Sequence, residues 1–480
     1  MARNNATLEK ALGIPTVGMV SLGFRRDFWA AARSYGIIDL PQVNVPREFT
    51  SCSDEDVRKQ AADAVEDIIK SLATRVRLQP EKIVTPLETP QPPAGCPAAL
   101  PVSANVIEFR ASRYEEAYDE FNRRFLDWGL GDGFPLVPPT REKVDWMLTG
   151  THHSPEEVVA EIDPAMGRAT VEKIAINAVM AGAQPEYLPV ILGAVEAIVD
   201  PRFELMKCAM STGPYTPFLW VNGPVVNEIG VNYGRGCLGP GAQSKVNIAI
   251  GRALRLIMMN IGGAYVGIGD LDTIGSAHKF SMVVAENEQE SPWAPYHVDK
   301  GFKAEESTVT ALCVVGQTEI HALDSNTPEE LLFTYVHTIC GIGDGSGMFG
   351  SPLSTDPAED SFRRSMGPTR YGHEPVLLLP PSAAQTFAAA GWTKNDIRAY
   401  LFENAWITKG LWMEHPKFKL DEGRNMAAKW RDAPLDAKIP IVLFPEAYQI
   451  LVVGGPANKM SYCPVGGSCA AVTKSVDNWR

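Results

Sequence analysis

The chain has 480 residues and a mass of 52.3 kDa, more than one average domain needs, so we expect about two or three folding units. Its composition, 45% hydrophobic and 21% charged, is that of an ordinary globular protein. The formal net charge of -13 excludes nucleic acid as an expected partner, because the phosphates would be repelled. An apolar leader and a run of about 18 apolar residues are both missing, so we expect a soluble, cytoplasmic protein without membrane contact.

The first 75 residues alternate between strand-like and helical patterns. "PTVGMVSL" at 15–22 is apolar and β-branched, and 25–36 has helical spacing that ends at a glycine. "LPQVNVP" at 40–46 is again extended, and 57–76 has the pattern of a helix. The order β-α-β-α predicts a small parallel α/β unit over residues 1–75.

Prolines are frequent in residues 76–104 ("TPLETPQPPAGCPAALP"), which indicates a linker. The patterns in residues 105–480 predict a large mixed α+β domain. Helical patterns in it cover 113–133, 141–151, 170–183 and 185–200. Strand-like runs are "FLWVNGP", "FSMVVAEN", "STVTALCVVG", "PVLLLP", "IPIVLFP" and "QILVVGG". The expected fold class is therefore α/β for the N-terminal unit and α+β for the rest.

The string "LEKALGIPTVGMVSLGFRRDFWAAARSYGIIDLPQVNVP", followed by "SDEDVRKQAADAVEDIIKSL", resembles the C-terminal half of the UGSC-type (seleno)protein family. These are small α/β proteins named for a Sec/Cys-Gly-Ser-Cys motif. In the family the motif precedes this segment, whereas only "MARNNAT" precedes it here. The comparable string is "GGSC" at Gly466–Cys469, with Gly466 at the Sec/Cys position, which implies a split unit completed by a C-terminal tail packed on the N-terminal layer. Residues 110–460 are similar to an enzyme-like bacterial module found with such segments.

A glycine-rich loop of the form G-x-G-x-x-G spans 234–239 and leads into a helix expected to begin near Ser244. No acidic residue follows about 20 positions later, so the dinucleotide fingerprint is incomplete and no nucleotide cofactor is favoured. The loop is either an anion-binding loop for a carboxylate or phosphate, or a structural turn. The predicted substrate-binding residues here are Arg235, Gly236, Gly239 and Lys245.

Two further segments hold acid and base candidates. The glycine-rich stretch 267–279 places Asp270 and His278 as catalytic candidates, with Asp272 and Lys279 as substrate-binding ones; the alternative is a solvated surface loop. The stretch 286–299 supplies Glu286 and Trp293 for binding. His297 is the favoured general acid/base, since aromatic neighbours can tune its pKa, although a lone histidine is also a common packing residue.

Metal and thiol chemistry would depend on other residues. The histidines show neither H-x-H nor H-E-x-x-H, so no dedicated metal site is predicted. A short helix over 470–479 would place Cys469 at its N-terminus, where the helix dipole lowers a thiol pKa, with Cys463 as a resolving partner. The alternative is a glycine turn with an unreactive thiol.

The leading hypothesis is a cytosolic enzyme, lyase- or hydrolase-like, that acts on a small anionic organic substrate by acid/base chemistry with cysteine participation. Its cofactor is left open. One alternative is a thiol-redox protein that uses Cys463 and Cys469. Another is a non-catalytic subunit that needs a partner chain. In the leading hypothesis we expect a homo-oligomer.

Overall fold

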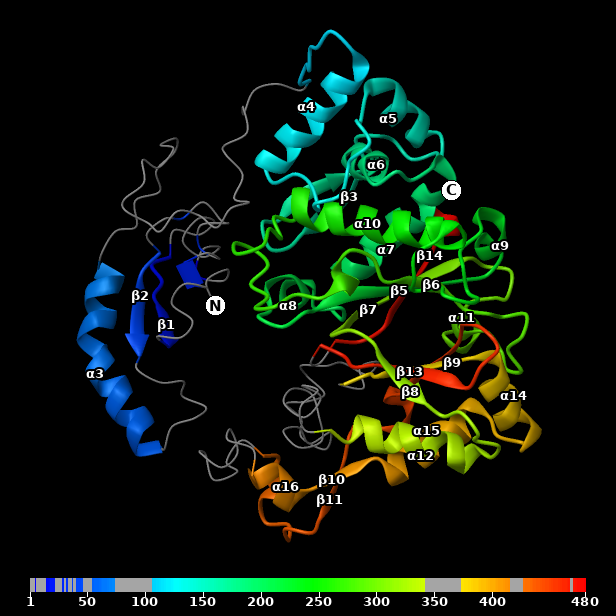
Figure 1. Cartoon of the computed structure of the whole chain (residues 1–480). Helices are drawn as coiled ribbons and strands as arrows, with labels where there is room; N and C mark the ends of the chain where they lie inside the picture. Colours follow the sequence, from blue (N-terminus) through cyan, green and yellow to red (C-terminus); the bar gives the residue numbers. More distant parts are fainter. Residues whose placement is uncertain are drawn as a thin grey trace.

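The computed structural model describes residues 14–21, 40–45, 54–73, 106–341, 373–414, 426–466 and 469–480, with a few single positions among the first 37. The predicted linker at 76–104 lies outside these residues. Figure 1 shows the described part as a small N-terminal unit and a large layered module.

The N-terminal unit is built as its alternating pattern predicts. Strand β1 (Gly18–Ser21) pairs in parallel with β2 (Gln42–Val45), and helix α3 (Asp54–Ala73) follows. Its small core contains Val20 and Phe28, and Met210 of the large module packs against this core. The expected parallel α/β arrangement is confirmed.

The first half of the large module is a four-stranded sheet of order β14-β7-β5-β6. Its central strand β5 runs parallel to β6 and antiparallel to β7, and every residue of β5 and β7 is buried. The strands are β5 (Thr216–Asn222), β6 (Val283–Ala285), β7 (Thr308–Val314) and β14 (Val472–Ser475). The helices above them are α6 (Val171–Met180), α7 (Leu188–Val199) and α10 (Lys245–Asn260). Helix α7 is apolar on nearly all sides because it packs on β7 and β14 and is covered by α6 and by residues 158–162.

The second half is another four-stranded sheet, of order β12-β9-β13-β8. Its strands are β8 (Thr318–His321), β9 (Val376–Leu379), β12 (Gln449–Val452) and β13 (Lys459–Cys463). Alternate residues of a strand face opposite sides, so Val376 and Leu378 join the core shared with the first sheet, whereas Leu377 and Leu379 join a second core. That second core is closed by α12 (Pro328–Ile339), α14 (Pro381–Ala389) and α15 (Lys394–Asn404). The result is four layers, helix-sheet-sheet-helix (Figure 1).

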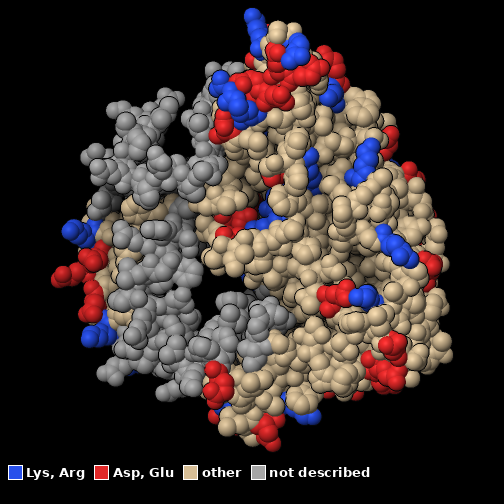
Figure 2. All heavy atoms as spheres, viewed as in Figure 1, with Lys and Arg blue, Asp and Glu red and all other residues tan. Residues whose placement is uncertain are grey.

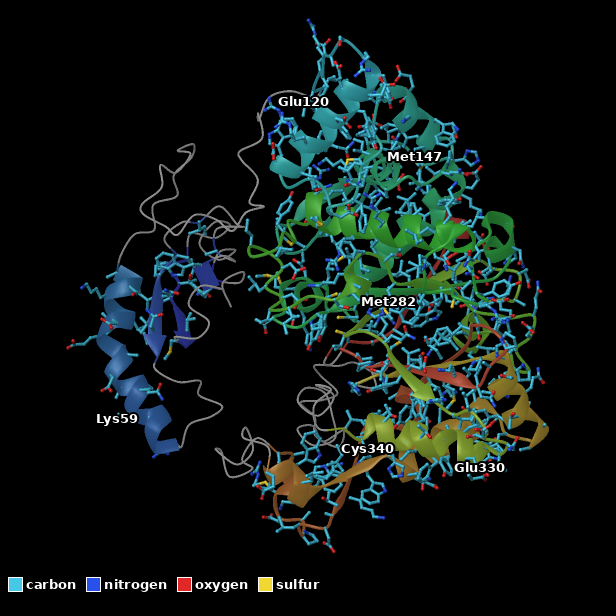
Figure 3. The ribbon with its side chains drawn as sticks, viewed as in Figure 1. Lys59, Glu120, Met147, Met282, Glu330 and Cys340 are labelled. Atoms are coloured by element: carbon cyan, nitrogen blue, oxygen red, sulfur yellow. The ribbon has the colours of Figure 1, made fainter. Side chains whose placement is uncertain are left out.

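Shorter elements complete the module. They are α4 (Tyr114–Asp127), α5 (Arg141–Leu148), β3 (Val158–Ile162), β4 (Gly167–Thr170), α8 (Leu205–Met210), α9 (Val225–Ile229), α11 (Tyr296–Asp299), β10 (Trp406–Thr408), α16 (Lys409–Glu414), α18 (Ala428–Arg431) and β11 (Lys438–Pro440). Figure 2 shows acidic and basic side chains mixed on α4 at the top of the view, where arginines pair with acids one helical turn away. Figure 3 shows side chains filling the space between the layers, with the buried Met147 and Met282 labelled. The mixed α/β and α+β class is confirmed.

The C-terminal segment departs from the sequence expectation. "KMSYC" is strand β13, buried between β9 and β8, and 472–475 form strand β14 rather than part of a helix. Val472–Ser475 pair with β7 and complete the hydrogen bonding of its edge. The extended conformation is therefore more stable here than the predicted helix. The tail therefore joins the two sheets of the large module. Residues 467 and 468 of "GGSC" lie outside the described residues, so the packing of this string on the N-terminal layer stays a prediction.

Candidate functional site

Polar side chains gather where the parallel strands β5 and β6 end. Because Val221 pairs with Ala285, the next residues, Asn222 and Glu286, come side by side. Asn222 Nδ2 donates to Glu286 Oε2 at 2.6 Å and to Glu288 Oε1 at 2.9 Å. Carboxyl ends of neighbouring parallel strands are common places for ligands in α/β sheets. The polar cluster is defined here as Asn222, Glu286, Glu288, His297, Thr308 and Lys394.

Glu286 is the carboxyl group at the centre of the polar cluster, with 1% of its surface exposed. Its Oε2 also accepts from the backbone N–H of Tyr296 at 2.6 Å, whereas Oε1 has no hydrogen-bond partner in the described part of the chain. Burial raises the pKa of Glu286, and the Lys394 charge, with Nζ 3.9 Å from Oε1, opposes this shift only in part. The group therefore holds a proton at higher pH than an exposed glutamate.

His297 lies on α11 and is completely buried. Neither ring nitrogen is hydrogen-bonded to any described residue, and the nearby carboxylate oxygen, Glu288 Oε1, is 3.7 Å from Nδ1. Asn222 Oδ1 and Thr308 Oγ1 are buried without a partner in the same part of the structure. Each such atom costs about 1–3 kcal/mol, and a group of them is unusual in a native interior. The polar cluster thus presents free donors and acceptors that a bound molecule could satisfy.

The polar cluster joins the two halves of the module. Lys394 begins α15, in the outer helical layer of the second half, and its Nζ donates to Ala294 O at 2.8 Å and to Asp299 Oδ2 at 2.9 Å. Trp293 anchors the same segment, since its Nε1 donates to Trp392 O at 3.0 Å. The Glu288 side chain is 25% exposed, so the cluster reaches the surface at this residue.

Three predicted site residues of the glycine-rich stretch bind one another. Lys279 Nζ lies 2.8 Å from both oxygens of Asp270 and 2.8 Å from Asp272 Oδ2. Although burial opposes ionisation, the hydrogen bond from Lys279 and the N–H of Gly275 hold the pKa of Asp272 below its ordinary value. Arg255 Nε donates to Lys279 O at 2.8 Å and closes the group. Their charges are compensated internally.

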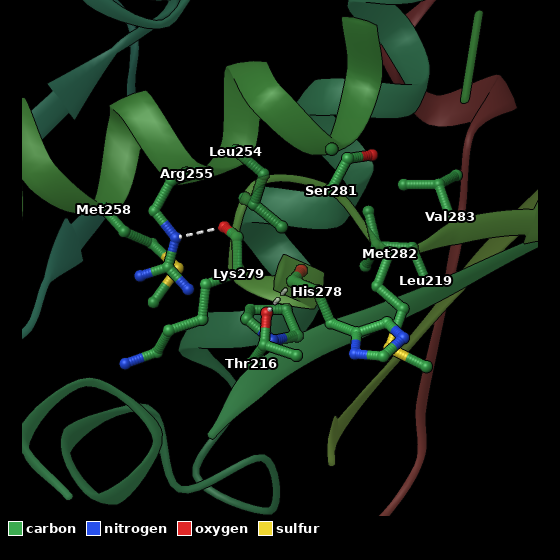
Figure 4. A pocket seen from close by; sticks show the side chains of 12 residues that line it. Thr216, Leu219, Leu254, Arg255, Met258, His278, Lys279, Ser281, Met282 and Val283 are labelled. Atoms are coloured by element: carbon green, nitrogen blue, oxygen red, sulfur yellow. Dashed lines mark hydrogen bonds between the residues drawn. The ribbon is translucent and has the colours of Figure 1, made fainter. Parts of the chain in front are cut away.

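His278 directly precedes Lys279, but in the close view of Figure 4 its ring points away from the Lys279 ammonium. Its Nδ1 is 3.1 Å from Ser276 Oγ, and the cavity it lines with Lys279 and Met258 has a volume of about 10 Å³. Such a volume admits about one water and no organic substrate.

The loop at 234–245 and the stretch at 267–279 meet along α10, at a surface depression called the groove. Its deeper part, about 500 Å³, is lined by Phe134, Pro135, Cys237, Leu238, Gly239, Pro240, Asn247, Ile248, Arg252, Ala277, Phe280, Ser281 and Val283. An adjoining part of about 400 Å³ shares Ile248 and Arg252 and adds Lys245. Gly236 supports the wall, since its carbonyl accepts from Ser244 Oγ at 3.2 Å. Arg235 lies instead against Gly455, after β12.

Cys469 has thiol neighbours that the sequence did not predict. The thiol of Cys313, at the end of β7, interacts with those of Cys208 on α8 and Cys469, and burial raises its pKa well above the ordinary value. These three form the thiol cluster. Burial alone raises the pKa of Cys463, the predicted resolving partner. With β14 in place of a helix, the dipole argument for a reactive Cys469 is wrong.

The described residues contain no group of three or more His, Cys, Asp or Glu side chains arranged to hold a metal ion. Within the same ranges, no helix combines the length and the apolar character needed to cross a membrane. Every cysteine in this part of the chain is a free thiol.

Sequence reasoning missed Asn222, Thr308 and Lys394 as site residues, whereas Glu288 lies within the predicted stretch 286–299. Asn222 could have been found, because it is a polar residue that ends an apolar strand just before Gly223 and Pro224. Lys394 carries no such signal, because it starts an ordinary helix more than 100 residues after Glu286.

Comparison with known proteins found a family match for the N-terminal unit only. Residues 2–74 match the model of the UGSC family. A search of curated proteins and a search of solved structures found no match. The matched residues include β1, β2 and α3, and the rest of the chain matches no family. The N-terminal unit is therefore similar to the UGSC family, as the sequence predicted.

Proposed function

We propose that the large module is an enzyme that transfers protons on a small anionic organic molecule at the polar cluster, in a lyase- or hydrolase-like reaction. The observation that supports this proposal is the convergence of Glu286 and His297 with several buried polar atoms that lack protein partners. Without a functional reason such an arrangement would only cost stability.

The surroundings of each residue in the polar cluster suit a particular role in the proposed reaction. Glu286, with its raised pKa, serves as the acid that donates a proton, and His297 serves as the base that accepts one, because its ring nitrogens are free of protein partners. Lys394 supplies the positive charge for the anionic group of the substrate. The Nδ2 group of Asn222 holds the two carboxylates of Glu286 and Glu288 in place.

The groove is less suited to this chemistry. No aspartate, glutamate or histidine lines either part of it among the described residues. The one thiol there, Cys237, has a pKa raised to about 11 by burial, so it stays protonated at neutral pH.

Thiol chemistry is a second candidate, favoured by the contact of Cys313 with Cys469 and Cys208. It would pair Cys469 with Cys313 rather than with Cys463. Burial raises the pKa of Cys313 and so disfavours its thiolate, which is the form that reacts. We therefore place acid/base chemistry first.

The experiment incubates the purified chain with a panel of small carboxylates and phosphate esters. NMR spectra then show which compounds are consumed. Glu286→Gln is expected to lower turnover by about 10²–10⁴-fold, the usual contribution of one acid/base group. The matched control Glu319→Gln makes the same change at an exposed residue paired with Lys459, and should retain activity. Full activity in Glu286→Gln would refute the proposal. Turnover by the isolated chain would also exclude the alternative of a subunit that needs a partner.

A further inference from the structure

We propose that the groove along α10 is a second ligand site, for an amphipathic carboxylate with an aromatic or branched apolar body. The site shares no residue with the polar cluster, so this inference does not depend on the proposed function.

The deeper part of the groove has the size and lining of a small-molecule pocket. Its volume of about 500 Å³ lies within the usual range of ~300–1,000 Å³. Phe134 and Phe280 form one wall, with ring centroids 5.0 Å apart in an edge-to-face arrangement, and Leu238 and Ile248 add aliphatic surface. These walls suit an aromatic or branched group.

Large apolar side chains remain in water here. Phe134 is 48% exposed, Phe280 43% and Ile248 38%. A ligand that covers them would gain hydrophobic free energy. Because the surface is concave, a small molecule covers it better than a flat protein surface would.

The shallower part of the groove is positively charged. Lys245 lies in the first turn of α10 and Arg252 two turns further on, and no acidic side chain among the described residues lines either part. Arg252 is neutralised by Asp132, whereas Lys245 has no ion-pair partner in the described structure. The unpaired charge at a helix N-terminus favours a carboxylate there.

The walls are held in place before any ligand binds. Arg252 Nη2 donates to Asp132 Oδ1 at 2.9 Å and to the carbonyls of Phe134 and Pro135 at 3.2 and 3.0 Å. Asn247 Nδ2 donates to the carbonyls of Asn232 and Val283 at 2.8 and 3.0 Å on the opposite side. Such fixed walls reduce the ordering cost of binding.

The test uses 1-naphthaleneacetate and its neutral counterpart 2-(1-naphthyl)ethanol as probes, with binding measured by calorimetry on the full chain. The acid should bind more tightly than the alcohol. Lys245→Gln should lower the affinity for the acid by about five- to tenfold and leave the affinity for the alcohol unchanged, because only the charge contact is lost. Ile248→Trp should block both probes by filling the groove.

Two control variants show whether the probes bind in the groove itself. Lys303→Gln removes an exposed lysine outside the groove and should change neither affinity. Glu286→Gln should also leave probe binding unchanged, so failure of the two proposals can be told apart. Unaltered binding in a folded Ile248→Trp variant, equal affinity for acid and alcohol, or no binding of either probe would overturn the inference.

Discussion

The strand pair β5 and β7 carries a buried cluster of opposite chemistry at each end. One end holds Asn222 and Thr308, with Glu286 and His297 beside them. The other end holds Cys313, with Cys208 and Cys469. Thr308 and Cys313 lie five positions apart on β7, about 17 Å at ~3.3 Å per residue.

The two ends differ in what burial costs them. Oxygen and nitrogen atoms lose strong hydrogen bonds to water, so the unpaired atoms of the polar cluster need a compensating function. Thiols are weak donors and pack as small hydrophobic groups, so the thiol cluster needs none. We therefore expect chemistry at the first end and packing at the second, and variants at either end can test that division.

Replacing one residue at each end should give the largest difference in turnover. His297→Gln is expected to lower turnover by about 10²–10⁴-fold, since a proton-transfer group is lost. Cys469→Ala should keep activity within about a factor of two, because a packing thiol takes no part in the reaction. Steady-state kinetics of both variants, with circular dichroism to verify folding, would check this. A reversed ranking would move the chemistry to the thiol end.

Crowding the thiol end should affect stability rather than turnover. A Cβ at Gly466 would lie 2.9 Å from Cys313 Sγ and 3.0 Å from the Tyr215 ring, so Gly466→Ala should lower the free energy of unfolding by about 1–3 kcal/mol. Gly234→Ala is the matched control, since its Cβ would meet only Asn232 at 3.6 Å. Urea denaturation measures both. Equal stability of the two variants would mean that the thiol end is loosely packed.

The polar end should make stability depend on pH. Because burial raises the pKa of Glu286 above 4.5, the folded state binds its proton more tightly than the unfolded state does. The stabilising contribution is complete at low pH and is lost as pH rises from about 4.5 to the folded pKa, by about 1.4 kcal/mol for each pH unit between these two values. Glu286→Gln cannot titrate, so its stability relative to wild type should increase across this window. Parallel urea curves at several pH values would show it, and a constant difference would contradict the raised pKa.

The smallest effect concerns the Lys394–Asp299 pair at the rim of the polar cluster. The Asp299 side chain is 35% exposed, so Asp299→Asn should lower the free energy of unfolding by only about 0.5 kcal/mol. The ammonium of Lys394, freed from Asp299, should then favour ionised Glu286 and flatten the pH dependence described above. Thermal unfolding at two pH values tests this. A steeper pH dependence would mean that Lys394 moves away from Glu286.

Local patterns in the sequence determined much of the architecture. Residues 170–183 and 185–200 form the α6 and α7 pair, because apolar residues at helical spacing leave few alternatives between buried layers. The order β-α-β-α in the N-terminal sequence likewise predicted the parallel pairing of β1 with β2, because a helix between two strands brings them side by side in the same direction. Glu286 and His297 were identified as candidates, and the loops at 234–245 and 267–279 do border a common groove.

Other features were decided only by tertiary structure, because they join residues far apart in the chain. The contact of Asn222 with Glu286 depends on the register of β5 with β6, and the position of Lys394 depends on how the outer helices pack on the second sheet. The strand at 472–475 forms because β7 offers an edge to pair with, and that edge lies more than 150 residues away in the chain. Cys469 likewise meets Cys313 and Cys208 only when three distant segments are folded together.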